Sequence, residues 1–263
     1  MKINQIYFSP TGSTKKVVQL LAQTWIGDGC DIDCSLPAGA GCDYSVYSFA
    51  KDELCIIGVP SFGGRVPAVM LAHLQQMKAA GTPTVLVTTF GNRDYDDTLL
   101  ELRDTVRQNG FHVIAAIAAV TEHSIMHRFG AGRPNDNDEK QLRDYAKRIQ
   151  LALESKTVDN LSEAAVSGSS PYKAFGSLPL KPAASNACTL CGTCAALCPV
   201  GAIPADNPRK TDKERCITCM RCVSICPQHA RKLNPVVLFA AERKMKKSCS
   251  TPKENSFFLG SAL

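Results

Sequence analysis

The segment CTLCGTCAALCP at residues 188–199 has the same cysteine spacing as the segment CITCMRCVSICP at residues 216–227. Both segments read C-x2-C-x2-C-x3-C-P, and together they contain eight of the 13 cysteines in the chain. Three thiolates spaced three residues apart on a tight turn can bind three irons of one cubane, whereas a fourth thiolate before proline reaches the neighbouring cluster. The repeat therefore predicts two [4Fe-4S] clusters with interleaved ligands.

This interleaving assigns three thiolates from one segment and one from the other to each cluster. We expect the first cluster on Cys188, Cys191, Cys194 and Cys226, and the second on Cys216, Cys219, Cys222 and Cys198. Two four-cysteine zinc sites are the alternative, because zinc also takes four thiolates from C-x2-C pairs. Zinc ribbons usually join two separated pairs, which gives no reason for three closely spaced cysteines and a fourth before proline in both segments.

Residues 186–232 resemble the bacterial two-cluster ferredoxins, because they contain both cysteine segments. A disulfide framework is disfavoured, since the N-terminus shows no secretory signal. The apolar stretch in Met1–Tyr7 is short, is interrupted by Asn4 and Gln5, and is followed by no cleavage-site pattern. We therefore expect the protein in a reducing compartment, the cytoplasm.

The chain has 263 residues, which leaves about 180 residues outside the ferredoxin-like segment for a separate core. The net charge of +6 is uneven: residues 181–263 contain 13 Lys and Arg against five Asp and Glu, whereas residues 1–180 contain 17 against 19. Two oxidised cubanes, each with a charge of about −2 including its thiolates, offset much of the C-terminal excess. No groove-reading motif accompanies the basic residues, so we expect no nucleic-acid partner.

The apolar runs are short. The longest, Val113–Val120, has eight residues, far fewer than the roughly 20 that a bilayer helix needs. We therefore expect no membrane span.

The first part of the chain alternates predicted strands with predicted helices. The expected strands lie at residues 3–8, 31–36, 54–58, 84–89 and 113–120, and the expected helices lie at residues 15–25, from 67, 94–108 and 136–153. This alternation predicts an α/β domain with a doubly wound, five-stranded parallel sheet that helices cover on both faces. A small α+β domain with the two clusters should follow.

The loop SPTGST at residues 9–14 is rich in small hydroxyl residues and joins the first strand to the first helix. Hydroxyl groups and free backbone N–H groups at a helix N-terminus bind phosphate without a metal. Neither G-x-x-x-x-G-K-[ST] nor G-x-G-x-x-G is present. A loop that only caps the helix is the alternative, but the pattern [ST]-x-T-G-x-T resembles the FMN-phosphate loop of flavodoxins.

Two later loops have the residues that a flavin ring needs. In flavodoxin-like folds the ligand lies outside the carboxyl ends of the strands, where the strand order reverses. The loop after the third strand offers paired glycines for close backbone approach and an aromatic face, and the loop after the fourth offers a second aromatic face. The candidate residues are Pro60, Ser61, Phe62, Gly63 and Gly64 in the first loop, and Thr89, Phe90, Gly91, Asn92 and Tyr95 in the second.

Residues 1–155 resemble a flavodoxin domain, and the whole chain resembles the fusion proteins that join a flavodoxin domain to a bacterial ferredoxin domain. The resemblance implies an FMN cofactor whose ring lies between the two later loops. It implies that the phosphate contacts Ser9, Thr11, Gly12, Ser13 and Thr14. One feature departs from the family: many flavodoxins have tryptophan in the first ring-facing loop, but the only tryptophan here is Trp25, expected in the core at the end of the first helix.

The composition divides the chain into four parts. We expect the FMN domain at residues 1–155, a linker rich in serine, proline and alanine at 156–185, the ferredoxin-like domain at 186–233 and a helical tail at 234–263. Within the linker, we expect residues 171–175 to attach to one of the two domains. The tail helix either docks the ferredoxin-like domain or offers a basic surface to an acidic partner.

Several other residues have two interpretations. Lys15 and Lys16 either add charge to the phosphate site or form a solvated helix face. The loop at residues 122–124, which contains Glu122, His123 and Ser124, is either structural or reaches the flavin. Acidic residues 94, 96 and 97 would disfavour an anionic reduced flavin if they face the ring. Cys55 is expected in the core, and Cys30, Cys34, Cys42 and Cys249 are expected as free thiols.

These features predict an electron-transfer protein that relays electrons between two [4Fe-4S] clusters and FMN and exchanges them with a redox protein in an anaerobic or microaerobic cell. Flavin takes up one or two electrons whereas each cubane passes one. The alternative is an FMN-dependent reductase of a small molecule, such as a quinone or nitro compound, that its own ferredoxin-like domain supplies with electrons. A roomy pocket over the flavin would favour the enzyme, and a thin flavin edge the carrier.

Overall fold

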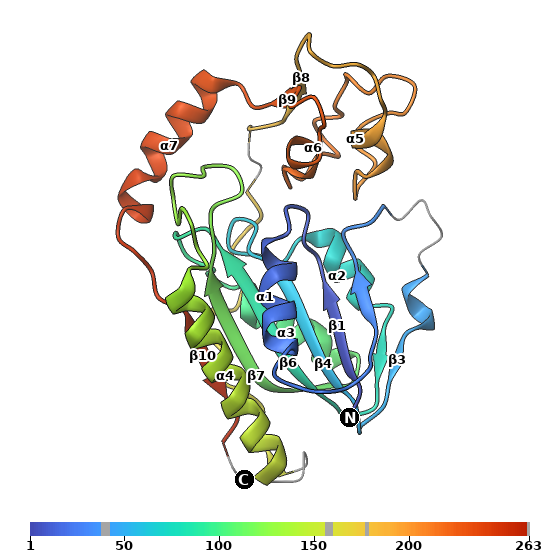
Figure 1. Ribbon diagram of the computed structural model, residues 1–263, viewed down its shortest axis with the longest axis vertical. Coiled ribbons are helices and arrows are strands. Elements are labelled where there is room, and N and C mark those ends of the chain that lie inside the picture. Colours follow the sequence, from blue (N-terminus) through green and yellow to red (C-terminus); the bar gives the residue numbers. More distant parts are fainter. Residues whose placement is uncertain (38–42, 156–159, 177–178, 262–263) are drawn as a thin grey trace.

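The computed structural model describes residues 1–37, 43–155, 160–176 and 179–261 (Figure 1). Cys42, which we expected as a free thiol, and residues 156–159 and 177–178 of the expected linker lie outside the described residues.

A six-stranded sheet forms the centre of the molecule, in the order β10-β7-β6-β4-β1-β2. Its strands are β1 (Ile3–Tyr7), β2 (Asp31–Asp33), β4 (Leu54–Pro60), β6 (Thr82–Phe90), β7 (Phe111–Val120) and β10 (Ser256–Leu259). The first five are parallel, in the order of the flavodoxin-like doubly wound folds. The expected parallel sheet is confirmed, and β10 extends it by one antiparallel strand beside β7.

Helices cover both faces of this sheet, because its inner strands are apolar on both sides. α1 (Ser13–Ala22) and α4 (Asp136–Ser155) bury side chains in one core cluster. α2 (Ala68–Leu74) and α3 (Thr98–Gln108) bury theirs in the other. Trp25, which we expected in the core, follows the end of α1 and is only partly buried against the first cluster.

Smaller elements lie beside the sheet. A short 3-10 helix, η2 (Tyr44–Val46), leads to β3 (Ser48–Phe49), which pairs in parallel with β5 (Lys78–Ala79).

The cysteine-rich part lies beyond the carboxyl ends of the parallel strands (Figure 1). It contains α5 (Thr193–Ala196) and α6 (Arg221–Ser224), and a two-stranded sheet of β8 (Ala183–Ala184) and β9 (Arg231–Lys232). Arg231 is buried and donates from Nη1 to Thr211 Oγ1 at 2.6 Å and from Nη2 to the carbonyl oxygen of Lys210 at 3.1 Å. This side chain ties the connection between the two cysteine segments to the strand that follows them.

The predicted linker follows the surface of the N-terminal domain. The carboxylate of Asp97 accepts hydrogen bonds from the backbone N–H groups of Ser169 at 2.8 Å and Lys173 at 2.6 Å. The Tyr172 hydroxyl donates to Asp104 at 2.7 Å. The Arg65 guanidinium lies 4.3 Å from the centroid of the Phe175 ring. Residues 169–175 are therefore pinned to the N-terminal domain.

The tail returns to the N-terminal domain. α7 (Pro235–Cys249) begins at the Asn234 cap, whose side chain accepts from the N–H groups of residues 236 and 237. After α7, Asn255 accepts a hydrogen bond from the N–H of Val120 at 2.9 Å and donates to Asp138 at 3.0 Å. These bonds align β10 with the edge of β7, so the tail is a strap that starts at the cysteine-rich part and ends in the central sheet.

Candidate redox site

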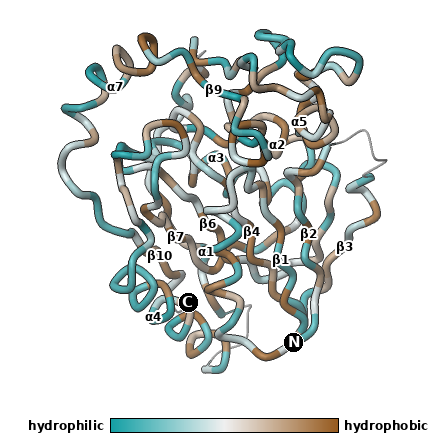
Figure 2. Tube along the Cα trace, turned by 45° about the horizontal axis from the view of Figure 1, so that its top comes forward, coloured by the Kyte–Doolittle hydropathy of each residue, from teal (hydrophilic) through white to brown (hydrophobic). Residues whose placement is uncertain are grey.

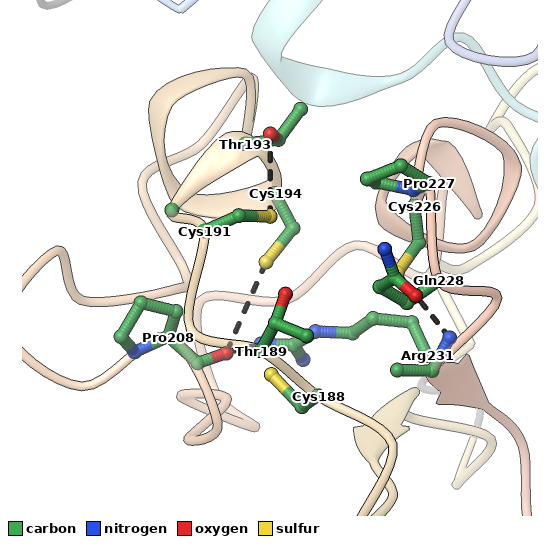
Figure 3. Close-up of a pocket in the computed structure, with 12 residues that line it drawn as sticks. Cys188, Thr189, Cys191, Thr193, Cys194, Pro208, Cys226, Pro227, Gln228 and Arg231 are labelled. Carbon is green, nitrogen blue, oxygen red and sulfur yellow. Dashed lines mark hydrogen bonds between the residues drawn. The ribbon is translucent and has the colours of Figure 1, made fainter.

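The four cysteines predicted to bind the first cluster line one cavity beside α5, which we call the cysteine cavity (Figure 3). Three of them, Cys188, Cys191 and Cys194, come from the first segment, and Cys226 comes from the second. Arg231 also lines the cavity, and its buried Nε has no hydrogen-bond partner among the described residues. A buried donor beside four thiols fits an iron–sulfur cluster, whose sulfur atoms accept hydrogen bonds.

The second set of cysteines is more buried. Burial is the largest cause that raises the pKa of the Cys219 thiol to about 11 and that of Cys222 to about 12. The neighbouring Cys198 and Cys216 thiols raise the pKa of Cys219 further. Among the described residues, no three His, Cys, Asp or Glu side chains are placed so that they could already hold a metal ion, so the ligand set stays a prediction. Thiols of this kind bind metal only as thiolates, so iron binding must supply the free energy that removes their protons.

The two segments fold alike. Leu190 and Gly192 in the first segment have positive φ angles of 59° and 76°, and the equivalent Thr218 and Met220 in the second have 57° and 64°. Positive φ is uncommon in residues other than glycine and is typical of functional turns. In each segment the last cysteine sulfur accepts a backbone N–H bond from four residues later, 3.2 Å for Cys198 and 3.3 Å for Cys226. Such bonds to sulfur tune cluster potentials.

A second cavity opens at the carboxyl ends of the parallel strands, and we call it the sheet-edge cavity. Ten of the predicted flavin-site residues line it: Ser9, Thr11, Ser13, Thr14, Pro60, Ser61, Phe62, Thr89, Phe90 and Gly91. The other lining residues are Pro10, Thr121, Glu122, His123, Ser124 and Cys219. Cys219 belongs to the second cysteine set, so the two predicted redox sites share a wall.

The hydroxyl loop forms one end of this cavity at the N-terminus of α1. Gly12 has a φ of 93°, which places it in the left-handed region that glycine tolerates. The hydroxyl of Ser9 accepts from the N–H of Lys15 at 2.9 Å, and the hydroxyls of Thr14 and Thr89 are 2.8 Å apart. Among the described residues, the N–H groups of Thr11 and Ser13 have no acceptor. They are available to an anion at the positive end of the helix dipole.

The two lysines that follow this loop do not line the cavity. The ammonium group of Lys16 pairs with Glu139 of α4 at 2.9 Å, and that of Lys15 lies 5.4 Å from the centroid of the Tyr7 ring. These contacts favour the interpretation of Lys15 and Lys16 as part of a helix face.

The loop after β4 brings one aromatic ring to the cavity. Phe62 lines the cavity and meets the Phe8 ring edge to face, with centroids 6.3 Å apart. The paired glycines have another role than we expected. Gly63 makes a turn with a φ of 66°, and a Cβ at Gly64 would lie 2.1 Å from the carboxylate of Asp96. Gly64 thus lets the two loops pack together, and neither glycine lines the cavity.

The loop after β6 also differs from the expectation. Asn92 does not line the cavity: its side chain donates to the carbonyl oxygen of Cys249 at 2.7 Å and accepts from the N–H of Lys253 at 2.8 Å. The structure thus corrects the assignment of Asn92 from the flavin to the tail. Tyr95 packs against Phe90, with ring centroids 5.3 Å apart, and lies outside the cavity lining.

The acidic residues after β6 do not line the cavity either. Burial of the Asp96 carboxyl group opposes its ionisation, but hydrogen bonds from Lys173 and Arg93 outweigh this effect and lower its pKa. The Asp97 carboxylate binds the linker. Their charges are therefore paired with other groups of the protein, and the expectation that they act directly on a flavin ring finds no support in the contacts.

Comparison with known proteins identifies the cysteine-rich part. A family model described as a 4Fe-4S dicluster domain matches residues 187–231. The thiosulfate reductase electron transfer subunit PhsB of Salmonella typhi is 48% identical over 44 residues, which are 16% of this chain and 23% of that protein. The chain thus matches about a quarter of the length of this relative. These residues form a 4Fe-4S domain of the ferredoxin type, as the cysteine spacing predicts.

Solved structures with similar folds cover the N-terminal part. They include the apo form of the NADH:FMN oxidoreductase EmoB, with 16% identity, a TM-score of 0.46, and coverage of 59% of this chain and 91% of that chain. The rubredoxin oxygen:oxidoreductase of Desulfovibrio gigas has 18% identity, a TM-score of 0.42, and coverage of 59% and 36%. A flavodoxin from the domain Archaea has 13% identity, a TM-score of 0.40, and coverage of 59% and 99%.

The strand order of the central sheet is itself flavodoxin-like. The chain therefore joins a flavodoxin-like domain to a ferredoxin-type iron–sulfur domain. In the part of the chain that the structure describes, every helix is too short or too polar to cross a bilayer.

Substitution of single cysteines by serine tests the interleaving of the cysteine ligands. We expect Cys226→Ser to damage the same cluster as Cys191→Ser, because both thiols line the cysteine cavity. Cys198→Ser should instead damage the same cluster as Cys219→Ser. Electron paramagnetic resonance of the reduced protein, with iron and sulfide analysis, distinguishes the two clusters. If Cys226→Ser gives the spectrum of Cys219→Ser, each segment binds its own cluster and the assignment is wrong.

Proposed function

We propose that this protein transfers electrons between two [4Fe-4S] clusters and an FMN bound in the sheet-edge cavity. The observation that carries the proposal is the position of Cys219, which lines this cavity together with the hydroxyl loop and Phe62. A ligand of one redox centre thus forms part of the wall around the other. A bound flavin would supply both one-electron and two-electron chemistry.

The residues of the sheet-edge cavity fit FMN. The N–H groups of Thr11 and Ser13 and the hydroxyls of the same loop would hold the phosphate at the N-terminus of α1. Phe62 and the end of β6, residues 89–91, would flank the ring. The cavity lies at the carboxyl ends of β1, β4, β6 and β7, where ligands bind in doubly wound folds.

The ferredoxin-type domain packs against this site through its second cysteine segment. Ile217 is partly buried against a core cluster of the N-terminal domain, and Thr218 and Met220 are only 4% and 5% exposed. Lys181 donates from Nζ to the carbonyl oxygen of Cys216 at 2.5 Å and to the hydroxyl of Thr218 at 3.1 Å. The second cluster would therefore lie next to the flavin.

The first cluster would lie on the side open to a partner. Cys191 is exposed, and the neighbouring Leu190 side chain is 54% exposed. We propose that a redox protein exchanges electrons at this exposed turn, and that the second cluster links the first to the flavin. Arg209 is exposed and donates to the carbonyl oxygen of Cys188 at 3.0 Å, so the turn offers a positive charge to an acidic partner.

A reductase of a small molecule is the alternative function. Such an enzyme needs room for its substrate over the flavin ring. The wall that contains Cys219 brings the ferredoxin-type domain to the cavity, and this arrangement favours exchange with the cluster at that side. The flavin and iron–sulfur domains are those of an oxidoreductase in either case.

The hydroxyl loop gives a direct test of the FMN site. Thr11→Ala should remove a charge-assisted hydrogen bond of about 1.5–3 kcal/mol, which weakens FMN binding about ten- to a hundredfold. Gly12→Val should weaken binding because a branched residue strains a backbone at φ 93°, although no atom lies within 4 Å of the added Cβ. Fluorescence titration with FMN measures both effects.

The matched control for these variants is Thr105→Ala on α3, whose hydroxyl donates to the carbonyl oxygen of Glu101 outside the cavity. It should bind FMN like the unchanged protein, and all three variants should keep their iron. Equal FMN affinity in Thr11→Ala, Gly12→Val and the control would refute the phosphate site.

Electron transfer within the chain tests the function itself. A flash-generated one-electron donor is added to anaerobic protein loaded with about eight irons and one FMN per chain. We expect the absorbance of the clusters to recover as the flavin is reduced, at a rate that does not depend on protein concentration, because the two domains are docked and linked. The Cys219→Ser variant should lose this phase. A rate that rises in proportion to protein concentration would show transfer between chains instead.

A further inference from the structure

The loop after β7 places a histidine in the sheet-edge cavity with one ring nitrogen already used. The Nδ1 atom of His123 accepts hydrogen bonds from the backbone N–H groups of Ile125 at 3.1 Å and Met126 at 3.2 Å. A nitrogen that accepts hydrogen bonds has no proton. The loop therefore fixes the tautomer of a neutral His123, whose proton must be on Nε2.

The surroundings of the ring keep it neutral. Burial lowers the pKa of His123 to about 4, and the neighbouring His127 and Arg93 side chains also lower it. At neutral pH the imidazole is therefore uncharged. Its Nε2–H group has no hydrogen-bond partner among the described residues, although the side chain lines the cavity.

The position of the ring is fixed as well as its tautomer. The N–H of His123 donates to the carbonyl oxygen of Phe129 at 3.0 Å, and the two rings meet edge to face with centroids 6.5 Å apart. On the other side, a Cβ at Gly91 would lie 2.5 Å from the Cβ of His123. Only glycine allows this approach, so the end of β6 and the loop after β7 hold the ring between them.

We propose that His123 is a flavin-contacting residue that donates a hydrogen bond from Nε2–H to an acceptor atom of the isoalloxazine ring. This proposal rests on the proposed FMN site and adds a role to it. The carbonyl oxygens and N1 of the flavin ring are acceptors, and reduction increases their electron density. N5 is excluded as the acceptor, because it takes up a proton on two-electron reduction and becomes a donor. A fixed donor therefore binds reduced FMN more tightly than oxidised FMN and raises the reduction potential of the flavin. Because the imidazole is neutral, it does so without adding a full charge.

The first test uses the apoprotein and needs no flavin. Long-range 15N–1H correlation spectra of histidine-labelled protein should show His123 as the Nε2–H tautomer. A spectrum with the proton on Nδ1, or with a charged ring at neutral pH, would overturn the proposal.

The second test compares variants that keep or remove the donor. His123→Leu should lower the affinity for reduced FMN about tenfold relative to that for oxidised FMN, which is a fall of 29.6 mV in a two-electron potential. His123→Gln should restore most of this difference, because its amide also donates. His127→Gln is the matched control, since it changes an exposed histidine of the same loop outside the cavity lining and keeps a donor for Glu122.

The outcomes separate the two proposals. If the unchanged protein binds no FMN, the proposed function fails and the role of His123 fails with it. If FMN binds normally and His123→Leu has the potential of the His127→Gln control, the FMN site stands and His123 is structural. A potential in His123→Gln as low as in His123→Leu also contradicts the hydrogen-bond role, because it shows that any replacement of the ring has the same effect.

Discussion

The turn at residues 217–220 packs against the carboxyl edge of the central sheet, and the geometry of both proposed redox sites depends on this contact. Ile217 joins a core cluster of the N-terminal domain, and Cys219 reaches the sheet-edge cavity. Removing apolar surface from water favours such packing by about 25 cal/mol per Å².

Two segments outside this contact hold the domains together. The linker is pinned by Asp97, and the tail runs back through Asn92 and Asn255 to pair with β7. Between them lies a small apolar cluster that joins the loop after β7, the linker and α7, and Figure 2 shows α7 and β10 on the same side of the molecule. The members of this cluster with buried side chains are Met126, Phe129, Leu180 and Cys249. The loop that carries His123 therefore packs against the strap that holds the ferredoxin-type domain.

The proposed cofactors would repel one another, because each cluster and the FMN phosphate would carry negative charge. Two cations of the chain lie beside the cysteines. Lys181 donates to the carbonyl oxygen of Cys216. Burial raises the pKa of Cys222, and the positive charge of the buried Arg231, which lines the cysteine cavity, opposes this rise. Such cations would stabilise the thiolates of bound clusters.

Much of the fold followed from local patterns. Apolar runs separated by helical segments predicted the four inner strands β1, β4, β6 and β7, because a strand buried on both faces must be apolar throughout. The edge strand β2 buries only Ile32 and is shorter than the expected 31–36. The fixed spacing of the cysteines predicted the cluster-binding domain. Long-range pairing was not predictable: four residues, Ser256–Leu259, extend the sheet, and no local pattern specifies which edge a short strand joins. Asn92 follows a strand at the expected edge of the sheet, but its side-chain amide binds the tail. The partner, Cys249, lies 157 positions further along the chain.

The candidate site shows the same division. The hydroxyl loop, Phe62 and the end of β6 were predictable because ligands of doubly wound folds lie at the carboxyl ends of strands. Cys219 in the cavity wall was not, since the docking of two domains depends on surfaces that no periodicity describes.

The proximity of the second cluster to the flavin is the central claim, and the spin relaxation of the flavin radical tests it most directly. A reduced, paramagnetic cluster accelerates the relaxation of a nearby radical. The sample is the loaded protein with the flavin in its radical state and the clusters reduced. We expect the flavin radical to relax faster in this protein than in the Cys219→Ser variant. The Cys191→Ser variant should keep most of this enhancement. Equal relaxation in the unchanged protein and in Cys219→Ser would contradict the account.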